Sequence, residues 1–244
     1  MIDWTSAQRR LAERGYYALD IDGRPGRGTY AGVFGFAAGR KPDATLLAIG
    51  AAATKVLPAH KIDATAERLG EFVAQTCNET GGFRVFEENL KYSVSAIRKA
   101  WPHRFPTDAA AQPFAWDPRD TDREDMALAA RVYGQRMGNL PRHLDDDNEE
   151  DGWQFRGRGM LQLTGRANYA EFGRLAGLPL VQHPELAADP ADSLKIAAIF
   201  WTRGKVNAAI DRGDFREARR ITNGGAIGLE HVAELRSRIL TILH

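Results

Sequence analysis

Proline and glycine divide the sequence into helix-length pieces joined by short polar loops, and this spacing limits the fold more than any other feature. Helices are predicted over 6–14, 44–57, 64–78, 122–137, 167–176, 191–203, 215–222 and 229–243. Strand signals are short and occur only at 82–86 and 153–164, the second containing the alternating LQLT. The fold class is therefore expected to be mainly α, with a small β-sheet beside a helical body and a long loop over 106–120.

Composition excludes several classes of protein. Hydrophobic residues make up 43% and charged residues 27%, which is typical of a soluble globular chain. A formal net charge of +1 provides no general field for nucleic acid or a membrane surface, so attraction to an acidic polymer would need a local cluster such as Arg156, Arg158 and Arg166. The single cysteine, Cys77, excludes an internal disulfide framework and indicates a reducing compartment. No window approaches the roughly 20 apolar residues of a membrane span, and the N-terminus lacks the apolar run of a secretory signal.

Glu79 is predicted to end a helix, because an apolar stripe at helical spacing stops before Gly81 and Gly82. The negative end of the helix dipole and nearby aromatic rings would favour the protonated form that a general acid needs. Glu88 follows across the Gly-Gly turn, so both carboxyls can face one cleft, as glycoside hydrolysis requires. The structural alternative is that Glu79 caps the helix or pairs with an arginine, while Glu87 and Glu88 are a solvated pair.

The segment RGRGMLQLTGRANY, residues 156–169, combines glycines with neutral polar side chains. Gln162, Thr164 and Asn168 offer hydrogen bonds suited to sugar hydroxyl and acetamido groups. Tyr169 and Trp153 are aromatic rings that can stack on a sugar. The alternative is a glycine-bent strand followed by a helix that Thr164 precedes. A third polar turn, ITNGG at 221–225, is by itself typical of a helix stop.

Taken together and in this order, these segments resemble glycoside hydrolase family 19, the chitinase-like family that includes many phage and prophage endolysins. The matching segments are NETGGF at 78–83, ENLKYS at 88–93, RMGN at 136–139, DGWQFRGRGMLQLTGRANY at 151–169, FW at 200–201 and ITNGG at 221–225. The resemblance implies a lysozyme-like helical domain with a small sheet flanking the cleft. It also implies an inverting hydrolase of β-1,4 linkages between N-acetylated amino sugars, which needs neither a cofactor nor a metal.

The resemblance also assigns roles to residues. Glu79 would protonate the leaving oxygen, Glu88 would activate water from the opposite face of the ring, and Thr164 would help to position that water. The matching substrate contacts are Gln162, Asn168 and Asn223. For inversion the two carboxyls are expected roughly 6.5–9.5 Å apart.

Some features of the sequence leave the roles of individual residues undecided. Spacing does not decide between Glu87 and Glu88 as the base, although the family pattern favours Glu88. Two positions depart from that pattern: Asn78 stands where many members have histidine, and Val232 stands where an arginine is common. An arginine-mediated contact is therefore left out of the predicted site.

The N-terminal segment, residues 1–42, resembles a small peptidoglycan-binding module, with an amphipathic helix, GYY, and DIDGRPGRGT opening a second helix. The alternative is an extra helical hairpin packed on the catalytic domain. On the first interpretation the chain has a wall-binding module at 1–42 and a family 19-like catalytic domain at 43–244.

Signals for other chemistry are weak. The acidic run 145–153 matches an EF-hand loop only in part, because Arg158 falls where a bidentate glutamate is needed. The histidines lack metal spacing, and Cys77 is expected to be a small buried side chain rather than a nucleophile.

The sequence thus predicts an endolysin, a muramidase that hydrolyses peptidoglycan glycan strands for host lysis. It is expected to be a monomer, made in the bacterial cytoplasm and released to the wall by a holin, with no nucleic-acid partner. The alternatives are a chitinase acting on N-acetylglucosamine polymer and a non-catalytic wall-binding protein.

Overall fold

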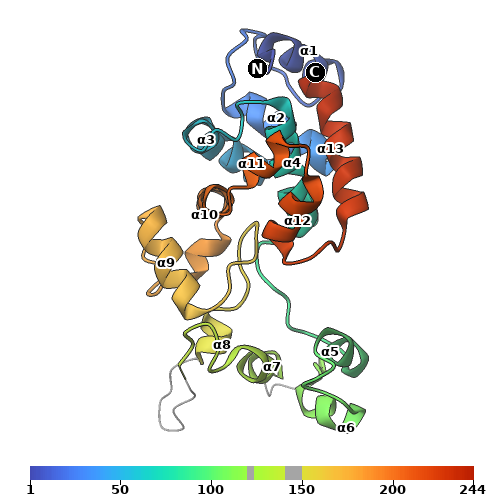
Figure 1. Cartoon of the computed structure of the whole chain (residues 1–244), viewed down its shortest axis with the longest axis vertical. Helices are drawn as coiled ribbons and strands as arrows, with labels where there is room; N and C mark the ends of the chain where they lie inside the picture. The colour runs from blue at the N-terminus through green and yellow to red at the C-terminus, as the bar shows by residue number, and fades with distance from the viewer. Residues whose placement is uncertain (120–123, 141–149) are drawn as a thin grey trace. The chain divides into compact units, whose positions relative to one another are not determined.

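The structure, a computed structural model, describes residues 1–119, 124–140 and 150–244. It is mainly helical and divides into two compact units (Figure 1). The first unit comprises Met1–Phe86, Gly159–Gln162 and Glu185–His244, and the second comprises Glu87–Arg158 and Leu163–Pro184. Each unit has a hydrophobic core of its own.

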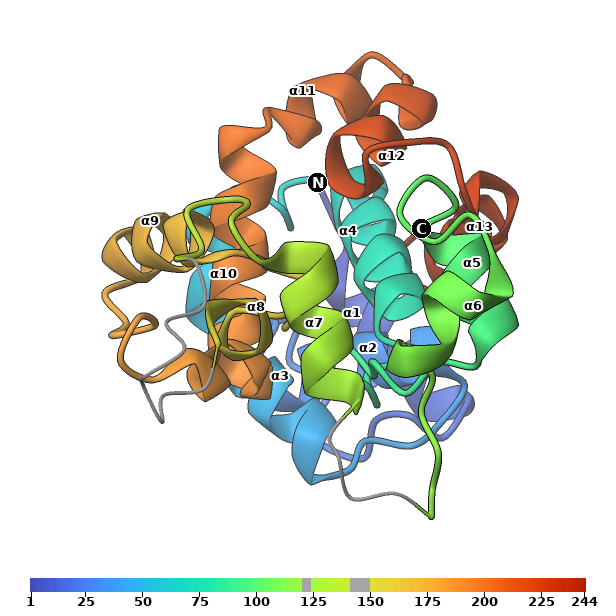
Figure 2. The same cartoon turned by 90° about the horizontal axis from the view of Figure 1, so that it is seen from below.

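The first unit is built around α4, which contacts α2, α11, α12 and α13 (Figures 1 and 2). Its helices are α1 (Trp4–Glu13), α2 (Arg27–Ala38), α3 (Ala44–Ala59), α4 (Ala66–Glu79), α10 (Pro190–Arg203), α11 (Val206–Asp211), α12 (Phe215–Asn223) and α13 (Leu229–Leu243). The 3₁₀ turn η2 (Pro184–Ala188) precedes α10. Thr65 begins α4 by accepting a hydrogen bond from the Arg68 N–H, and Asp214 begins α12 in the same way. These caps fix where the two helices that carry the candidate site start.

The N-terminal segment lies in this first unit. Leu11 of α1 and Phe34 of α2 belong to the same core cluster as Leu46 of α3. The buried Gln8 holds the loop between α1 and α2, donating to Asp22 at 2.9 Å and accepting from the Gly23 N–H at 2.8 Å. The segment is thus packed against the helices that follow it, and its binding to peptidoglycan stays a prediction.

We expect Trp201→Ala to lower the free energy of unfolding by about 3–5 kcal/mol. The Trp201 ring is fully buried against Phe72, with centroids 5.0 Å apart, and its indole N–H donates to Asn207 at 2.8 Å. Urea denaturation followed by circular dichroism measures the loss. Trp116, which is 40% exposed, is the matched control, and its replacement by alanine should cost under about 1 kcal/mol. Equal losses for the two variants would contradict the assignment of Trp201 to the core.

The second unit has helices of its own around a separate core. They are α5 (Val94–Ala100), α6 (Asp108–Ala111), η1 (Gln112–Phe114), α7 (Glu124–Tyr133), α8 (Asp151–Gln154) and α9 (Arg166–Ala176). Leu90, Ile97, Phe105, Leu128 and Val132 are buried together in this core. The stretch 106–120, predicted as a loop, contains α6 and η1, because the Thr107 hydroxyl accepts from the Ala110 N–H and starts a helical turn. That prediction was wrong for 108–114.

The predicted small β-sheet is not present in the part of the chain that the structure describes. The only pairing there consists of isolated bridges from Arg158 to Glu87 and to Leu163. Residues 159–162 form a tight turn instead of an extended strand, with left-handed backbone at Gly159 (φ 80°) and Gln162 (φ 53°). Trp153 lies in α8 rather than in a strand. The alternation of LQLT therefore reflects a turn and not a pleated strand.

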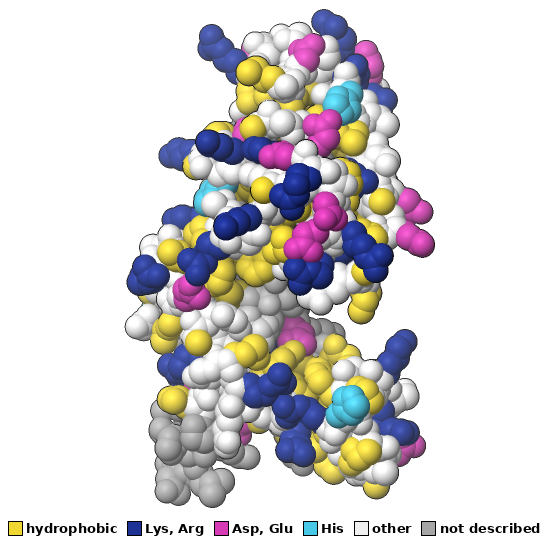
Figure 3. Space-filling model, viewed as in Figure 1, with side chains coloured by type: hydrophobic (Ala, Val, Ile, Leu, Met, Phe, Trp, Pro, Cys, Tyr) yellow, Lys and Arg dark blue, Asp and Glu magenta, His cyan; other side chains and the backbone are white. Residues whose placement is uncertain are grey.

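The predicted helices are otherwise present among the described residues, and 122–123 lie outside them. The helix predicted to reach 137 ends at Tyr133, and left-handed backbone follows at Gln135 and Met137. None of the helices that the structure describes is long and apolar enough to cross a membrane. On the face shown in Figure 3, basic and acidic side chains are interspersed over the helices of the first unit rather than gathered by sign.

Candidate functional site

Glu79 is the last residue of α4, as predicted. The Thr80 hydroxyl donates to the Thr76 carbonyl at 2.6 Å and accepts from the Phe83 N–H at 3.0 Å, which closes the turn after the helix. Gly81 and Gly82 follow with φ of 54° and 77°, a backbone that side chains disfavour. The turn therefore fixes the helix end that carries the carboxylate.

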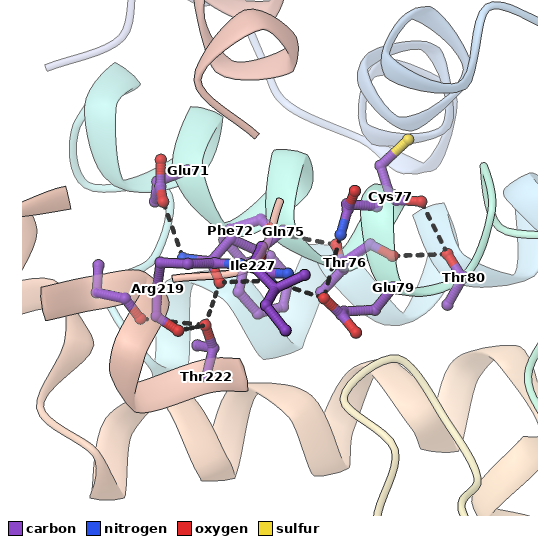
Figure 4. Close-up of polar contacts among 12 residues, drawn as sticks. Glu71, Phe72, Gln75, Thr76, Cys77, Glu79, Thr80, Arg219, Thr222 and Ile227 are labelled. Atoms are coloured by element: carbon purple, nitrogen blue, oxygen red, sulfur yellow. Dashed lines mark hydrogen bonds and ion pairs between the residues drawn. The ribbon is translucent and has the colours of Figure 1, made fainter. Parts of the chain in front are cut away.

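Arg219 of α12 forms an ion pair with Glu79, with 2.7 Å between guanidinium and carboxylate (Figure 4). The Arg219 side chain is only 2% exposed, whereas the Glu79 side chain is 19% exposed. Asn78, the residue that departs from the family pattern noted above, donates to the same carboxylate at 3.2 Å. The arginine pairing weighed as the structural alternative is thus real. Sequence reasoning missed Arg219 because several arginines crowd this helix and only the packing of α12 selects one of them.

A buried chain of polar side chains begins at Arg219, whose guanidinium lies 3.5 Å from the side-chain oxygen of Gln75 in the same unit. Gln75 donates to Glu71 at 2.8 Å, and Arg236 of α13 donates to the other Glu71 oxygen at 2.9 Å. Burial raises the pKa of Glu71, and the hydrogen bond from Arg236 opposes that rise. The acid end of α4 is therefore linked to both α12 and α13.

Glu88 lies in the second unit and is held by two hydrogen-bond donors. The Tyr133 hydroxyl, at the end of α7, is 2.8 Å and 3.0 Å from the two carboxylate oxygens, and the Gly157 N–H donates at 3.3 Å. Burial raises the pKa of Glu88, and the Tyr133 hydrogen bond partly offsets the rise. Tyr133 was also missed, because no sequence pattern relates it to a residue so far along the chain.

Glu87 has different surroundings from its neighbour. It is ion-paired with Arg156 and, at 3.3 Å, with Arg158. Burial and the neighbouring Arg158 lower the pKa of Arg156 to about 10. Glu87 is therefore held by two guanidinium groups, whereas the partners of Glu88 are a hydroxyl and an amide.

The arginine cluster considered for attracting an acidic polymer forms ion pairs within the second unit. Arg156 and Arg158 share Glu87, and both oxygens of Asp151 bind Arg166, at 2.5 Å and 2.6 Å. These arginines are therefore structural ion-pair partners.

The two aromatic residues predicted to stack on sugar differ in position. Tyr169 is fully buried, its ring against Phe155 at 5.2 Å and its hydroxyl donating to the Arg156 carbonyl at 2.7 Å. The prediction that Tyr169 contacts substrate was wrong, because a ring with no exposed surface cannot stack on a sugar. Trp153 is only partly buried, and the Arg156 guanidinium lies 3.7 Å from its ring centroid. One face of that ring is thus already covered.

The remaining predicted residues lie near chain turns. The Asn168 side chain donates to the Thr164 carbonyl at 2.7 Å, at the start of α9. Gln162 belongs to the first unit, where its amide donates to the Gly159 carbonyl at 3.2 Å. Asn223 ends α12 before the left-handed Gly224, as the helix-stop interpretation predicted. Roles for Thr164, Gln162, Asn168 and Asn223 toward a substrate stay predictions.

Metal and thiol chemistry find no support in the residues that the structure describes. No cluster of three histidine, cysteine or acidic side chains occurs among them, and the acidic positions 145–149 lie outside them. Cys77 is buried, and burial raises the pKa of its thiol to about 11, which disfavours the thiolate.

Each candidate carboxylate is thus defined within its own unit, Glu79 in the first and Glu88 in the second. That the two share one cleft stays a prediction.

Comparison with known proteins identifies relatives by sequence and by fold. No family profile matches the chain. A glycosyl hydrolase family 19 domain-containing protein of Haemophilus influenzae is 33% identical over 165 residues, which are 67% of this chain and 74% of that protein. An endochitinase of Arabidopsis thaliana is 33% identical over 91 residues, 37% of this chain and 32% of its own length.

Among solved structures, a bacterial family 19 chitinase superposes with a TM-score of 0.53 at 18% identity. The match covers 86% of this chain and 92% of that one, so the two share a fold. The family is shown by the extended similarity to the Haemophilus protein: this chain belongs to glycosyl hydrolase family 19.

Proposed function

We propose that this glycoside hydrolase is an endolysin that cleaves β-1,4 bonds in the glycan strands of bacterial peptidoglycan, with inversion at the sugar carbon. Glu79 is the general acid and Glu88 is the general base. One observation carries the proposal: each carboxyl is oriented by fixed donors within its own unit, Glu79 by Arg219 and Asn78 at a helix end, and Glu88 by the Tyr133 hydroxyl and the Gly157 N–H. Hydrolysis by two carboxyls requires both groups to be held in place.

In this mechanism a proton moves from Glu79 to the glycosidic oxygen as the bond from that oxygen to the sugar carbon breaks. Glu88 takes a proton from water, and the water oxygen bonds to the opposite face of the same carbon. The two carboxyls then stand in exchanged protonation states and return to the starting states through solvent. The chemistry requires no cofactor.

Two features support Glu88 as the base: the donors that hold its carboxylate, and the ion pairs that occupy its neighbour Glu87. The Tyr133 hydroxyl and the Gly157 N–H orient its oxygens, and both donate to the charged form that a base needs. Thr164, also in the second unit, is the proposed partner of the attacking water. Glu87 is a poorer candidate because Arg156 and Arg158 already hold its carboxylate.

The choice of peptidoglycan rests on residues 1–42. Their loop between α1 and α2 is held by Gln8, and it exposes the apolar side chains of Leu19 and Ile21. We propose that this loop contacts the wall polymer. The protein would be made in the bacterial cytoplasm, reach the wall when a holin opens the membrane, and act as a monomer.

A chitinase activity is the second candidate, because the Arabidopsis relative is named an endochitinase. Chitin and peptidoglycan share the β-1,4 linkage and the acetamido groups, so the same carboxyl pair would serve both.

Mass spectrometry of the products separates these functions. We expect purified peptidoglycan to release disaccharide-peptides with unmodified reducing ends, at a rate at least about tenfold above that on chitin oligomers. Faster release from chitin would favour the chitinase. Products with 1,6-anhydro ends would contradict hydrolysis altogether, and wall binding without any product would support a non-catalytic protein.

A further inference from the structure

We propose that Arg219 is a positioning residue for the acid, and that a buried polar chain through Gln75 and Glu71 holds Arg219 in place. This inference rests on the proposed role of Glu79 as the proton donor. It concerns residues of the first unit only, from α4, α12 and α13.

The Arg219 guanidinium is fixed on two sides by its own unit. One nitrogen donates to the Ile227 carbonyl at 2.9 Å, in the loop between α12 and α13, and another lies 2.7 Å from Glu79 (Figure 4). The latter nitrogen is also 3.5 Å from the side-chain oxygen of Gln75. A buried guanidinium with these partners has one available position, so the carboxylate that it binds is located as well.

Gln75 is itself oriented by its partners. Its oxygen accepts from the Thr222 hydroxyl, and its nitrogen donates to Glu71 at 2.8 Å. The remaining oxygen of Glu71 accepts from Arg236 at 2.9 Å. Because Arg219 can only donate, it meets the oxygen of the Gln75 amide, and the amide nitrogen then faces Glu71.

The charges along this chain alternate, from Arg236 through Glu71 and Arg219 to Glu79. Glu71 and Arg219 are buried, whereas Glu79 remains partly exposed at one end. A partly exposed glutamate side chain can adopt several rotamers, and a catalytic group needs placement within about 0.5 Å. When Glu79 gives its proton to the leaving oxygen, the anion that forms lies against a guanidinium that is already in place.

The test compares Arg219→Met with Arg220→Met, since Arg220 is the next residue on α12 and its ion pair with Glu217 is exposed. On peptidoglycan oligosaccharides we expect Arg219→Met to lower kcat by about 10²-fold with little change in KM, as misplacement of a reacting group does. Arg220→Met should retain kcat. Circular dichroism and thermal unfolding establish that both variants are folded.

A second substrate separates positioning of the acid from a structural role. A 4-nitrophenyl glycoside of the same oligosaccharide releases a leaving group that needs no proton, so the loss in Arg219→Met should shrink at least about tenfold on it. Arg219→Lys, which keeps the charge, should recover part of kcat on the natural substrate. Gln75→Met should lower kcat by about tenfold, because Arg219 then loses the neighbour that orients it.

An equal loss on both substrates, or unchanged kcat in Arg219→Met, would overturn the inference. The outcome for Glu79→Gln identifies which proposal has failed. If Glu79→Gln is inactive while Arg219→Met is fully active, only the role of Arg219 is wrong. If Glu79→Gln itself keeps full activity, the proposed function of Glu79 is wrong.

Discussion

Replacing Glu79 by glutamine is expected to lower hydrolysis of peptidoglycan by about 10²–10⁴-fold while leaving binding to cell walls unchanged. Glutamine has nearly the same shape, and its amide oxygen can still accept from Arg219 and Asn78, which both contact the Glu79 carboxylate. It has no acidic proton to give to the leaving oxygen. Turbidity of permeabilised Gram-negative cells and release of reducing ends measure the loss, and co-sedimentation with purified walls measures binding.

Glu217→Gln is the matched control, because Glu217 also belongs to the first unit and pairs with an arginine of α12, but at the surface. We expect this variant to lyse cells at the wild-type rate. Retained lysis in Glu79→Gln would show that another group donates the proton. Loss of wall binding together with lysis would indicate damage to the fold rather than to the chemistry.

The fold could be predicted where local signals decide it. Thr65 and Asp214 cap helices through their own side chains, and Gly81 and Gly82 end α4 with backbone that glycine favours. The small sheet could not be predicted correctly, because Gln162 adopts left-handed backbone inside a segment that alternates like a strand. The turn there is set by the pairing of its flanking residues and not by composition.

The candidate site could be predicted only in part, for a related reason. The position of Glu79 follows from the periodicity of a single helix. Arg219 and Tyr133 are far along the chain from the carboxylates that they contact, so only packing brings them together. Tyr169 shows the opposite error, since an aromatic residue in a polar segment indicated sugar stacking whereas the ring is buried in the core.

Glu88→Gln is expected to lower kcat by about 10²–10⁴-fold, whereas Glu87→Gln should lower it by less than about tenfold. The amide at position 88 keeps an acceptor for Tyr133 but cannot take a proton from water. At position 87 the amide keeps an acceptor for Arg156, and no reacting group is lost. Reducing-end release at saturating glycan measures both variants side by side, and a larger loss in Glu87→Gln would assign the base to Glu87.

The pH dependence of kcat/KM is an independent test of Glu88 as the general base. A base works when deprotonated, and burial raises the pKa of Glu88, so activity should fall on acidification at a higher pH than for an exposed glutamate. The Tyr133 hydrogen bond favours the charged form of Glu88, so Tyr133→Phe removes that stabilisation and should move the acidic limb to still higher pH. At pH values well above the limb the variant should recover most of its activity, because Glu88 is then charged in both proteins. A limb that stays in place in Tyr133→Phe would mean that Glu88 is not the group whose ionisation controls the reaction.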